Sequence, residues 1–152
     1  MGGSGGKWKM FVGEYRHSLD EKSRIVLPSK FRSSLSPTVY LSLGLDRCLE
    51  IVPADIFISE ANEIIKMGKF NPQARALRRL KFDNSIEASI DKQGRIILPK
   101  NLLDKASIVK DVVILGDGDR IEIYASNVFD ELNSRDLPNF EEIASSLANR
   151  KE

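Results

Sequence analysis

The sequence predicts an α+β protein made of two tandem copies of one unit, each with the element order β-β-α-β-β-α-α. First, a ten-residue segment at 19–28 recurs at 90–99, which indicates an internal duplication. Second, each copy contains a β-branched run that ends at a proline, as expected for a strand. Third, apolar residues at helical spacing recur towards the end of each copy, which predicts closing helices there.

The duplication centres on the motif Asp-x-x-x-Arg, which is followed by Leu-Pro in both copies. The motif occurs at 20–24 and again at 91–95, an offset of 71 residues. A second block, Leu49–Ile51, matches Ile121–Ile123 at an offset of 72 residues. Two matched blocks at nearly the same offset make a chance match a poor explanation, so the duplication covers most of the chain.

The first copy is expected to open with a strand in which Phe11, Gly13 and Tyr15 share one face. Pro53 is expected in the first turn of the helix that follows the fourth strand. In chain order, the expected elements are strands at 11–15, 24–27, 39–43 and 48–52, a short helix around Phe31 and Leu35, and helices at 53–65 and 73–82.

The second copy repeats this order, with Ser126 as an expected helix N-cap and Gly116–Asp119 as a hairpin turn rather than a calcium loop. We expect the apolar stripes of the closing helices, such as Leu77 with Leu80 and the stripe at 140–147, to be buried in the core. The expected elements are strands at 86–90, 95–98, 112–115 and 120–124, a short helix at 102–106, and helices from 126 and after Pro138.

Three segments are expected along the chain of 152 residues. Residues 1–9 are rich in Gly and Ser and are expected to be an appended leader, with Met10 as the native start. The first repeat is expected at 10–82 and the second at 83–152. No apolar run reaches the roughly 18 to 20 residues of a membrane-spanning helix. The single cysteine, Cys48, excludes an internal disulfide framework and fits a reducing cytoplasm.

The charge is nearly balanced overall but unevenly distributed. Net charge is +1, yet basic residues gather around the first motif and again at 75–81, while acidic residues gather towards the C-terminus. A near-neutral chain with one basic face can bind DNA with modest affinity per copy. A mixed, solvated surface explains the same clusters, so charge by itself leaves both interpretations open.

The chemistry of the motif suggests a preorganised arginine. An aspartate at the start of a turn can accept hydrogen bonds from backbone N–H groups two or three residues further on. Gly94 suits a turn position with positive φ. Arg24 and Arg95 then begin the returning strand at the tip of a hairpin, where the aspartate can hold the guanidinium. Arginine makes bidentate contacts with phosphate or with guanine O6 and N7.

A purely structural role is the alternative for the pairs Asp20–Arg24 and Asp91–Arg95. Exposed ion pairs contribute roughly 0 to 1 kcal/mol, so stability is a weak reason to repeat one at matching positions. From the spacing, the structural and functional interpretations carry about equal weight.

The residues around both motifs resemble the MraZ family, bacterial regulators of the division and cell-wall gene cluster. The resemblance rests on the opening Met10-Phe11-x-Gly13-Glu14-Tyr15-x-His17-Ser18-Leu19-Asp20-x-Lys22-x-Arg24 with the following Leu-Pro, and on the second motif at the family spacing. It covers nearly the whole chain from Met10 onwards.

The resemblance implies a fold and a function. The family is similar to AbrB-type swapped-hairpin proteins, so the two repeats are expected to form one pseudo-two-fold β-barrel with peripheral helices. Family members form ring-shaped homo-oligomers that bind short repeated boxes in double-stranded promoter DNA. The family's contact residues fall on Asp20 with Arg24 and on Asp91 with Arg95. Ser23 stands where glycine is common, so the first turn is expected to be slightly strained or differently shaped if this position needs positive φ.

A ring would present several basic turns together, and multivalency raises affinity without new contacts. Candidates for phosphate contacts that position the protein on DNA are Arg16, Lys22, Lys30 and Lys92. The resemblance also implies a cytoplasmic, nucleoid-associated protein without a membrane segment, cofactor, metal or small-molecule substrate.

Two other classes of function remain as alternatives. A duplicated pair of aspartates is also found in aspartic proteases, but here no Asp-Thr/Ser-Gly follows, and a nearby arginine favours ionised carboxylates. His17 is expected to be a strand residue and Cys48 a small core residue, so neither completes a catalytic site. The third class is an assembly scaffold that binds protein and no nucleic acid.

Overall fold

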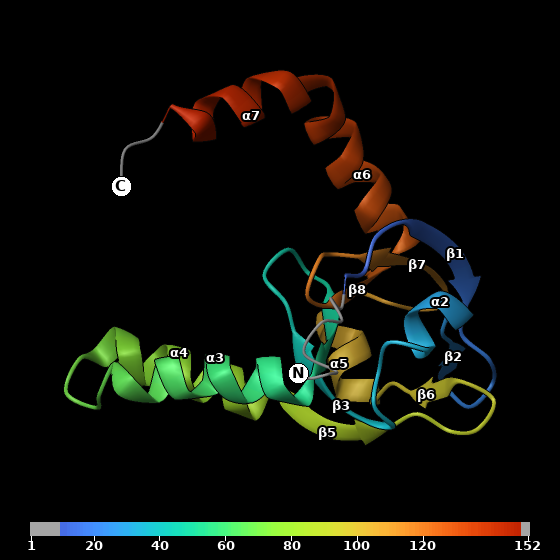
Figure 1. Ribbon diagram of the computed structural model, residues 1–152, viewed down its shortest axis with the longest axis horizontal. Coiled ribbons are helices and arrows are strands. Elements are labelled where there is room, and N and C mark those ends of the chain that lie inside the picture. Colours follow the sequence, from blue (N-terminus) through green and yellow to red (C-terminus); the bar gives the residue numbers. More distant parts are fainter. Residues whose placement is uncertain (1–9, 150–152) are drawn as a thin grey trace, which may run out of the picture.

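The computed structural model describes residues 10–149 and has the predicted α+β class (Figure 1). The predicted leader lies outside the described residues. In chain order the elements are β1 (Glu14–Ser18), β2 (Arg24–Val26), α2 (Ser29–Arg32), β3 (Thr38–Leu43), β4 (Leu49–Pro53), α3 (Ala54–Lys66), α4 (Pro72–Asp83), β5 (Ser85–Ser89), β6 (Arg95–Ile97), α5 (Lys100–Lys105), β7 (Asp111–Gly116), β8 (Ile121–Ala125), α6 (Ser126–Asp136), the 3₁₀ helix η1 (Leu137–Asn139) and α7 (Phe140–Ala148). The order β-β-α-β-β-α-α therefore occurs twice, as predicted.

The strands form two antiparallel sheets. The larger sheet has six strands in the order β1-β7-β8-β4-β3-β5, and the smaller one is the ribbon β2–β6. If β1 to β4 are exchanged with β5 to β8, each sheet has the same strand order again, read from its opposite edge. The duplicated sequence is therefore matched by a duplicated pattern of strand pairing.

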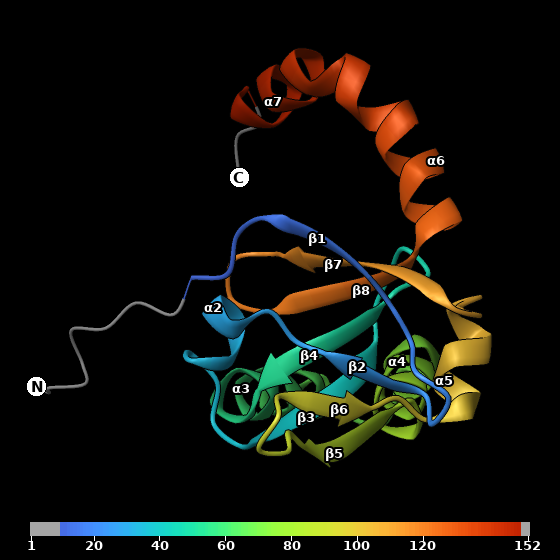
Figure 2. The same ribbon diagram turned by 90° about the vertical axis from the view of Figure 1, so that its right-hand side faces the viewer.

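The strands on either side of each motif do not pair with each other, so the predicted hairpin around the motif is wrong. β1 instead pairs with β7, which places Arg16 opposite Val113, and β2 pairs with β6, which places Ile25 opposite Ile96 (Figure 2). Each repeat thus completes the sheets of the other. Alternating apolar residues identify a strand but not its partner, because equivalent strands of two repeats carry equivalent patterns.

The core lies between the ribbon and the larger sheet. Ile25 and Ile96 of the ribbon are completely or almost completely buried, as are Ile51 of β4 and Ile123 of β8. Cys48 is also fully buried, as expected for a small core residue. Because both repeats contribute to this one core, neither has a core of its own.

Two predicted helix starts are wrong by one residue. Pro53 ends β4 and acts as the N-cap of α3, which begins at Ala54. Ser126 is the first residue of α6, whose N-cap is Ala125, and no side chain caps that helix. In contrast, the side chain of Asn71 accepts hydrogen bonds from Gln73 N and Ala74 N at the start of α4.

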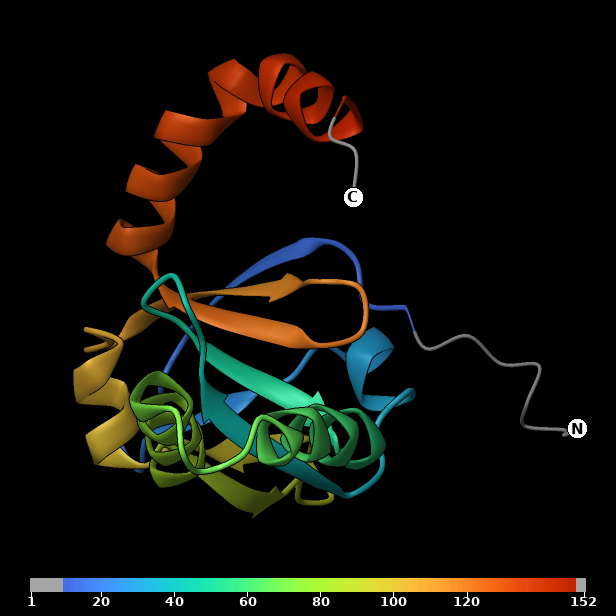
Figure 3. The ribbon, with the colours of Figure 1, turned by 90° about the vertical axis from the view of Figure 1, so that its left-hand side faces the viewer.

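The closing helices lie at opposite ends of the molecule. The pair α3 and α4 packs beside the sheet, whereas α6 leads away from the sheet to α7 at the other end (Figures 1 and 3). The expectation that their apolar stripes are core is wrong for α4 and α7. Leu77 and Leu80 of α4 are exposed, as are Phe140, Ile143 and Leu147 of α7. Helical periodicity shows that a face is apolar but not what covers it.

Candidate nucleic-acid interface

The first motif forms a tight turn organised by the Asp20 carboxylate. Its Oδ1 accepts backbone hydrogen bonds of 2.9 Å from both Lys22 N and Arg24 N. The backbone closes the same turn, because Ser23 N donates to Asp20 O and Asp20 N donates to Arg24 O, each at 3.0 Å. The prediction that the aspartate sets the turn is confirmed, with contacts two and four residues further on.

The same carboxylate also fixes the arginine. Arg24 Nε donates to Asp20 Oδ2 at 2.7 Å, and 23% of the Arg24 side chain remains exposed. This contact uses one edge of the guanidinium. Among the described residues, the two terminal nitrogens of Arg24 have no hydrogen-bond partner, so they remain available at the protein surface.

The second motif repeats this geometry. Asp91 Oδ1 accepts from Gln93 N at 2.9 Å and from Arg95 N at 2.8 Å, and Arg95 Nε donates to Asp91 Oδ2 at 2.8 Å. One contact differs, because Arg95 Nη2 also donates to Gln93 Oε1 at 3.2 Å. The second arginine is therefore held by two side chains and the first by one.

Both turn carboxylates are stabilised in the ionised form. The backbone N–H of Arg24 lowers the pKa of Asp20, and that of Arg95 lowers the pKa of Asp91, with further help from each guanidinium. A pair of aspartates that shares a proton needs one carboxyl group with a raised pKa. The electrostatics of the two turns are therefore opposite to those of an aspartic-protease dyad.

The ribbon joins the two turns into one unit. Leu27 N donates to Gly94 O and Leu98 N donates to Ser23 O, both at 2.9 Å. Because Ile25 and Ile96 point into the core, the alternate residues of each strand face outwards. The outward face of the ribbon consists of Arg24, Val26, Arg95 and Ile97, and we call it the ribbon face.

The fourth residue of both turns is left-handed, so the first turn keeps the shape of the second and only the expected strain at Ser23 is found. Ser23 has φ of 58° and Gly94 has φ of 80°, so a serine adopts the left-handed conformation in the first turn. Gly94 has a second constraint, because a Cβ there would collide with the side chain of Arg32. Arg32 Nη1 donates to the carbonyl oxygen of Gln93 at 2.8 Å. The second turn is thus supported from α2.

The predicted lysines lie at or near the turns. Lys22 and Lys92 are exposed within the turns, and Lys30 is exposed on α2, whose Arg32 contacts the second turn. Among residues 10–149, none of these three lysines forms an ion pair with a carboxylate. Their charge is available to an anionic partner.

Arg16 is placed differently from the lysines. It lies on β1, where its Nη2 contacts Glu14 Oε2 at 3.1 Å and Asp130 Oδ1 at 2.9 Å. Its guanidinium also lies 5.8 Å from the centre of the Phe129 ring. These contacts hold Arg16 against α6 and balance its charge, so the structure does not bring it to either turn.

Sequence reasoning missed two residues that adjoin the turns. Arg32 supports the second turn, and Lys110 lies with Val109 beside the first turn in a surface groove of about 720 Å³. Lys110 also accepts a 2.9 Å backbone hydrogen bond from Leu19 N. No local pattern could have indicated Lys110, because it comes from the other repeat through the β1–β7 pairing.

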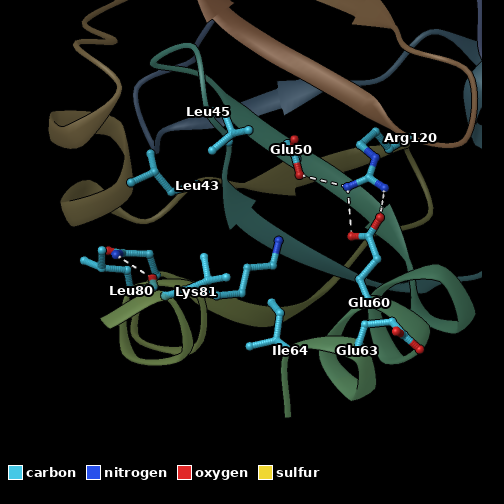
Figure 4. A pocket seen from close by; sticks show the side chains of 12 residues that line it. Leu43, Leu45, Glu50, Glu60, Glu63, Ile64, Leu80, Lys81 and Arg120 are labelled. Carbon is cyan, nitrogen blue, oxygen red and sulfur yellow. Dashed lines mark hydrogen bonds and ion pairs between the residues drawn. The ribbon is translucent and has the colours of Figure 1, made fainter. Parts of the chain in front are cut away.

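A second cluster of charges lies away from the ribbon and is centred on Arg120. Its guanidinium bonds Glu50 of β4 at 3.1 Å and Glu60 of α3 (Figure 4). It also bonds the neighbouring Asp119. Arg120 and Glu50 each have only 12% of the side chain exposed. Since Glu50 and Glu60 lie in the other repeat, this cluster ties the β7–β8 hairpin to β4 and α3.

Glu122 lies directly opposite Glu50 in the β4–β8 pairing. Burial, together with the nearby Asp117, raises the pKa of Glu122 to about 7, and Tyr124 Oη donates to its Oε1 at 3.1 Å. Burial also raises the pKa of the Cys48 thiol to about 12. Cys48 is therefore a protonated core residue rather than a thiolate nucleophile.

His17 lies in β1 opposite Val112, and the segment at 116–119 connects β7 to β8 as a turn, both as predicted. No helix of residues 10–149 is both long enough and apolar enough to cross a membrane.

Comparison with known proteins identifies the family. A family model described as MraZ protein, antitoxin-like, matches residues 10–80 and again residues 82–151. A protein of Clostridium tetani named Transcriptional regulator MraZ is 41% identical over 139 residues, which cover 91% of this chain and 97% of the relative. Proteins of the same name from Mycoplasmoides gallisepticum (39% identical over 138 residues) and Dictyoglomus thermophilum (41% over 141 residues) match with the same coverage of both chains. The chain therefore belongs to the MraZ family.

Proposed function

We propose that this protein regulates transcription by binding double-stranded promoter DNA through its two Asp-x-x-x-Arg turns. One observation carries the proposal: Arg24 and Arg95 lie on the same face of one ribbon, and each is fixed by the aspartate of its own turn. The names of the relatives support the same function. Family resemblance adds the target, repeated boxes upstream of the division and cell-wall gene cluster.

The arginine geometry suits direct readout of bases. Since Asp20 engages Nε of Arg24, the terminal nitrogens are left to approach guanine O6 and N7 as a bidentate pair. A side chain already held in position loses less rotamer entropy on binding. Val26 and Ile97, which are 44% and 61% exposed on the ribbon face, can contact thymine methyl groups. The face thus combines polar and apolar groups for reading sequence.

Phosphate contacts are assigned to the lysines around the turns. Three exposed lysines carry a charge that no carboxylate neutralises among the described residues: Lys22, Lys92 and Lys30. Lys110 lies next to the first turn. We keep Arg16 as a candidate of lower rank, because Glu14 and Asp130 already balance its charge. Phosphate contacts would position the protein on the duplex without reading its sequence.

The proposal includes a swapped-hairpin barrel and a ring of several copies. The strand order is unchanged when the two repeats are exchanged, and this symmetry supports a pseudo-two-fold barrel. Exposed apolar stripes on α4 and α7 support self-association. A ring would align several ribbon faces with several boxes, and linked weak contacts give high overall affinity.

The experiment is a binding titration with promoter DNA, by fluorescence anisotropy at defined salt. Arg24→Ala and Arg95→Ala should each weaken specific binding about tenfold or more, because a bidentate arginine contributes about 1 to 3 kcal/mol of discrimination. Arg135→Ala on α6 is the matched control and should bind normally, since that arginine is exposed and far along the chain from both turns. Thermal melting checks that all three variants are folded. Unchanged affinity in both turn variants would contradict the proposal.

An assembly scaffold that binds protein is the second candidate, and the exposed apolar face of α7 favours it. Salt separates the two functions. DNA affinity should fall steeply as salt rises, with a slope in log–log coordinates of about −0.9 per phosphate neutralised. Apolar protein contacts should hold or strengthen under the same change. We do not propose an enzyme, because both turn carboxylates have lowered pKa values and are held by arginine.

A further inference from the structure

A surface hollow of about 320 Å³ beside α4 is lined by cations and contains no carboxylate. Four of its five lining residues are basic, and we call these four the α4 cluster: Lys69, Arg75, Arg78 and Arg79. The fifth lining residue is the half-buried Phe82. Because the whole chain has a net charge of only +1, the hollow is a local concentration of positive charge.

The spacing of the three arginines places them on one face of α4. Arg75, Arg78 and Arg79 are three and four residues apart, which is about one turn of an α-helix. The carboxylates of α3 that lie near α4 line the pocket on its opposite face, together with Leu77 and Leu80. The acidic side chains closest to α4 in the fold therefore lie on the side that the arginines do not face.

The charge of the α4 cluster is not balanced by the protein. Among the described residues, none of its four side chains forms an ion pair, and neither does Asp83, the only acidic residue of α4. Like charges three and four residues apart on a helix repel each other and destabilise it. The first turn of α4 also lacks an acidic residue, although the positive end of the helix dipole lies there. A bound anion would relieve this repulsion.

The guanidinium groups are suited to phosphate. Arg75 Nη1 donates to the carbonyl oxygen of Lys69 at 2.8 Å, which joins the helix to the α3–α4 connection and fixes the arginine. Within residues 10–149, the side chains of Arg78 and Arg79 have no hydrogen-bond partner. Arginine binds phosphate oxygens through two parallel N–H donors, so each free guanidinium offers a complete phosphate contact.

Duplex DNA is the source of phosphate that the observations favour. Arg75 and Arg79 lie about 6 Å apart along the helix axis. Successive phosphates of one DNA strand are about 3.4 Å apart along the duplex axis, so the two arginines can reach neighbouring phosphates. A helix that lies on a membrane inserts an apolar face, whereas the hollow has the half-buried Phe82 as its only apolar lining residue.

The α4 cluster and the ribbon face lie on different sides of the molecule. Figure 1 shows α3 and α4 on the left and the ribbon β2–β6 on the right. A straight duplex seated on the ribbon face therefore does not cover the α4 cluster.

We propose that the α4 cluster is a second DNA-binding surface, which holds the phosphate backbone of a separate duplex segment without reading its sequence. This inference rests on the proposed function, from which it takes DNA as the partner, and adds a second site to it. With both surfaces occupied, one protein brings a promoter box and another DNA segment together.

Binding of a labelled duplex without boxes tests the α4 cluster, by fluorescence anisotropy of the full chain over a range of salt. Arg78→Ala with Arg79→Ala should weaken binding about tenfold and make the log–log salt slope shallower by about 1.8, because each lost phosphate contact removes about 0.9. Arg78→Lys with Arg79→Lys should retain most of the affinity, because contacts that only position the duplex depend on charge. Thermal melting checks that the variants are folded.

The matched control removes two exposed arginines elsewhere. Arg47→Ala with Arg135→Ala takes them from a hollow that also contains Asp46 and Glu131, so their loss should leave affinity for the duplex unchanged. Equal losses in the control and in the cluster variant would indicate a general effect of charge and overturn the assignment.

Recruitment of a second duplex tests whether the two surfaces act separately. Protein bound to an immobilised box duplex should capture a labelled duplex without boxes. Arg78→Ala with Arg79→Ala should lose most of this capture and keep the wild-type preference for box over scrambled DNA. Undiminished capture would overturn the second surface.

Vesicles of phosphatidylglycerol and phosphatidylcholine form the other arm of the test, because Phe70, next to Lys69, is 98% exposed. If Arg78→Ala with Arg79→Ala abolishes vesicle binding and leaves DNA capture intact, a lipid surface replaces DNA as the occupant and the proposal is overturned.

The turn variants separate this inference from the proposed function. Arg24→Ala and Arg95→Ala should remove the preference for box DNA, whereas the cluster variant should not. If the turn variants keep that preference, the proposed function fails. If they lose it and the cluster variant binds DNA as the wild type does, only the second surface fails.

Discussion

The backbone N–H of Leu27 donates a 2.9 Å hydrogen bond to the carbonyl oxygen of Gly94, the residue before Arg95 in the turn of the other repeat. Leu98 makes the equivalent bond to Ser23. Each turn is therefore attached to the strand that leaves the other turn. A shift of one strand along the ribbon would move both arginines, so the two DNA-contact candidates form one rigid unit rather than two independent loops.

The turn aspartates should affect specificity more than stability. Asp20→Asn keeps an oxygen that can accept the backbone N–H groups of the turn but loses the charge that holds Arg24. We expect the ratio of specific to non-specific DNA affinity to fall about tenfold, because an unrestrained arginine loses about 1 kcal/mol or more of discrimination. Parallel titrations with box DNA and scrambled DNA measure this ratio. Asp136→Asn, which alters an exposed pair on α6, is the control and should leave the ratio unchanged.

The left-handed turn residues should respond in opposite directions to substitution. Ser23→Gly should stabilise the fold by about 0.5 kcal/mol, because the relief of a left-handed serine exceeds the entropy cost of glycine by a small margin. Gly94→Ser should destabilise it by about 2 kcal/mol, because the new side chain is strained and displaces Arg32. Urea unfolding midpoints report both changes. Equal effects at the two positions would contradict the described asymmetry.

Glu122 should make the protein less stable as the pH rises through neutrality. Its pKa in the folded state is about 7, above its ordinary value near 4.5, so the folded state binds the proton more tightly than the unfolded state. The stability that protonation contributes is complete below about pH 4.5 and is lost as the pH rises through 7. Glu122→Gln should remove this dependence and add about 1 kcal/mol at pH 8, a modest gain because water reaches part of the side chain. Melting temperatures of both proteins from pH 5 to pH 8 check the sign. A wild-type curve that rises over this range would contradict it.

Arg120 should be among the residues on which stability depends most. Arg120→Met leaves Glu50 nearly buried, opposite Glu122 and without its cation. Breaking a buried pair in this way costs about 3 to 5 kcal/mol. The loss should be smaller at pH 5 than at pH 8, since the abandoned carboxylates can then bind protons. Chemical denaturation at both pH values measures the difference, and Arg135→Met serves as the exposed control with little expected effect.

The sequence predicted what is local and repeated, and it missed what depends on partners. The turns could be predicted from the sequence because each aspartate bonds groups within four residues of itself. The strand pairing could not be predicted, because β1 and β5 have similar patterns of apolar residues and each repeat contains a strand that could pair with either of them. Likewise, the stripe on α7 predicted an apolar face correctly but not its exposure. The role of Arg32 depends on a contact with Gln93, 61 residues away in the sequence, which no local pattern encodes.

The pairing of β1 with β7 also sets the order of events when the chain is made. Ser18 bonds Asp111, 93 residues further on, so β1 leaves the ribosome long before its partner exists. At about 5 to 20 residues per second, the first strand waits roughly 5 to 20 s for its neighbour. Contacts of such long range also slow folding, because loop closure precedes any gain from pairing. During that interval the first repeat is an incomplete sheet with open edges, which makes synthesis the stage at which this protein is most exposed to aggregation.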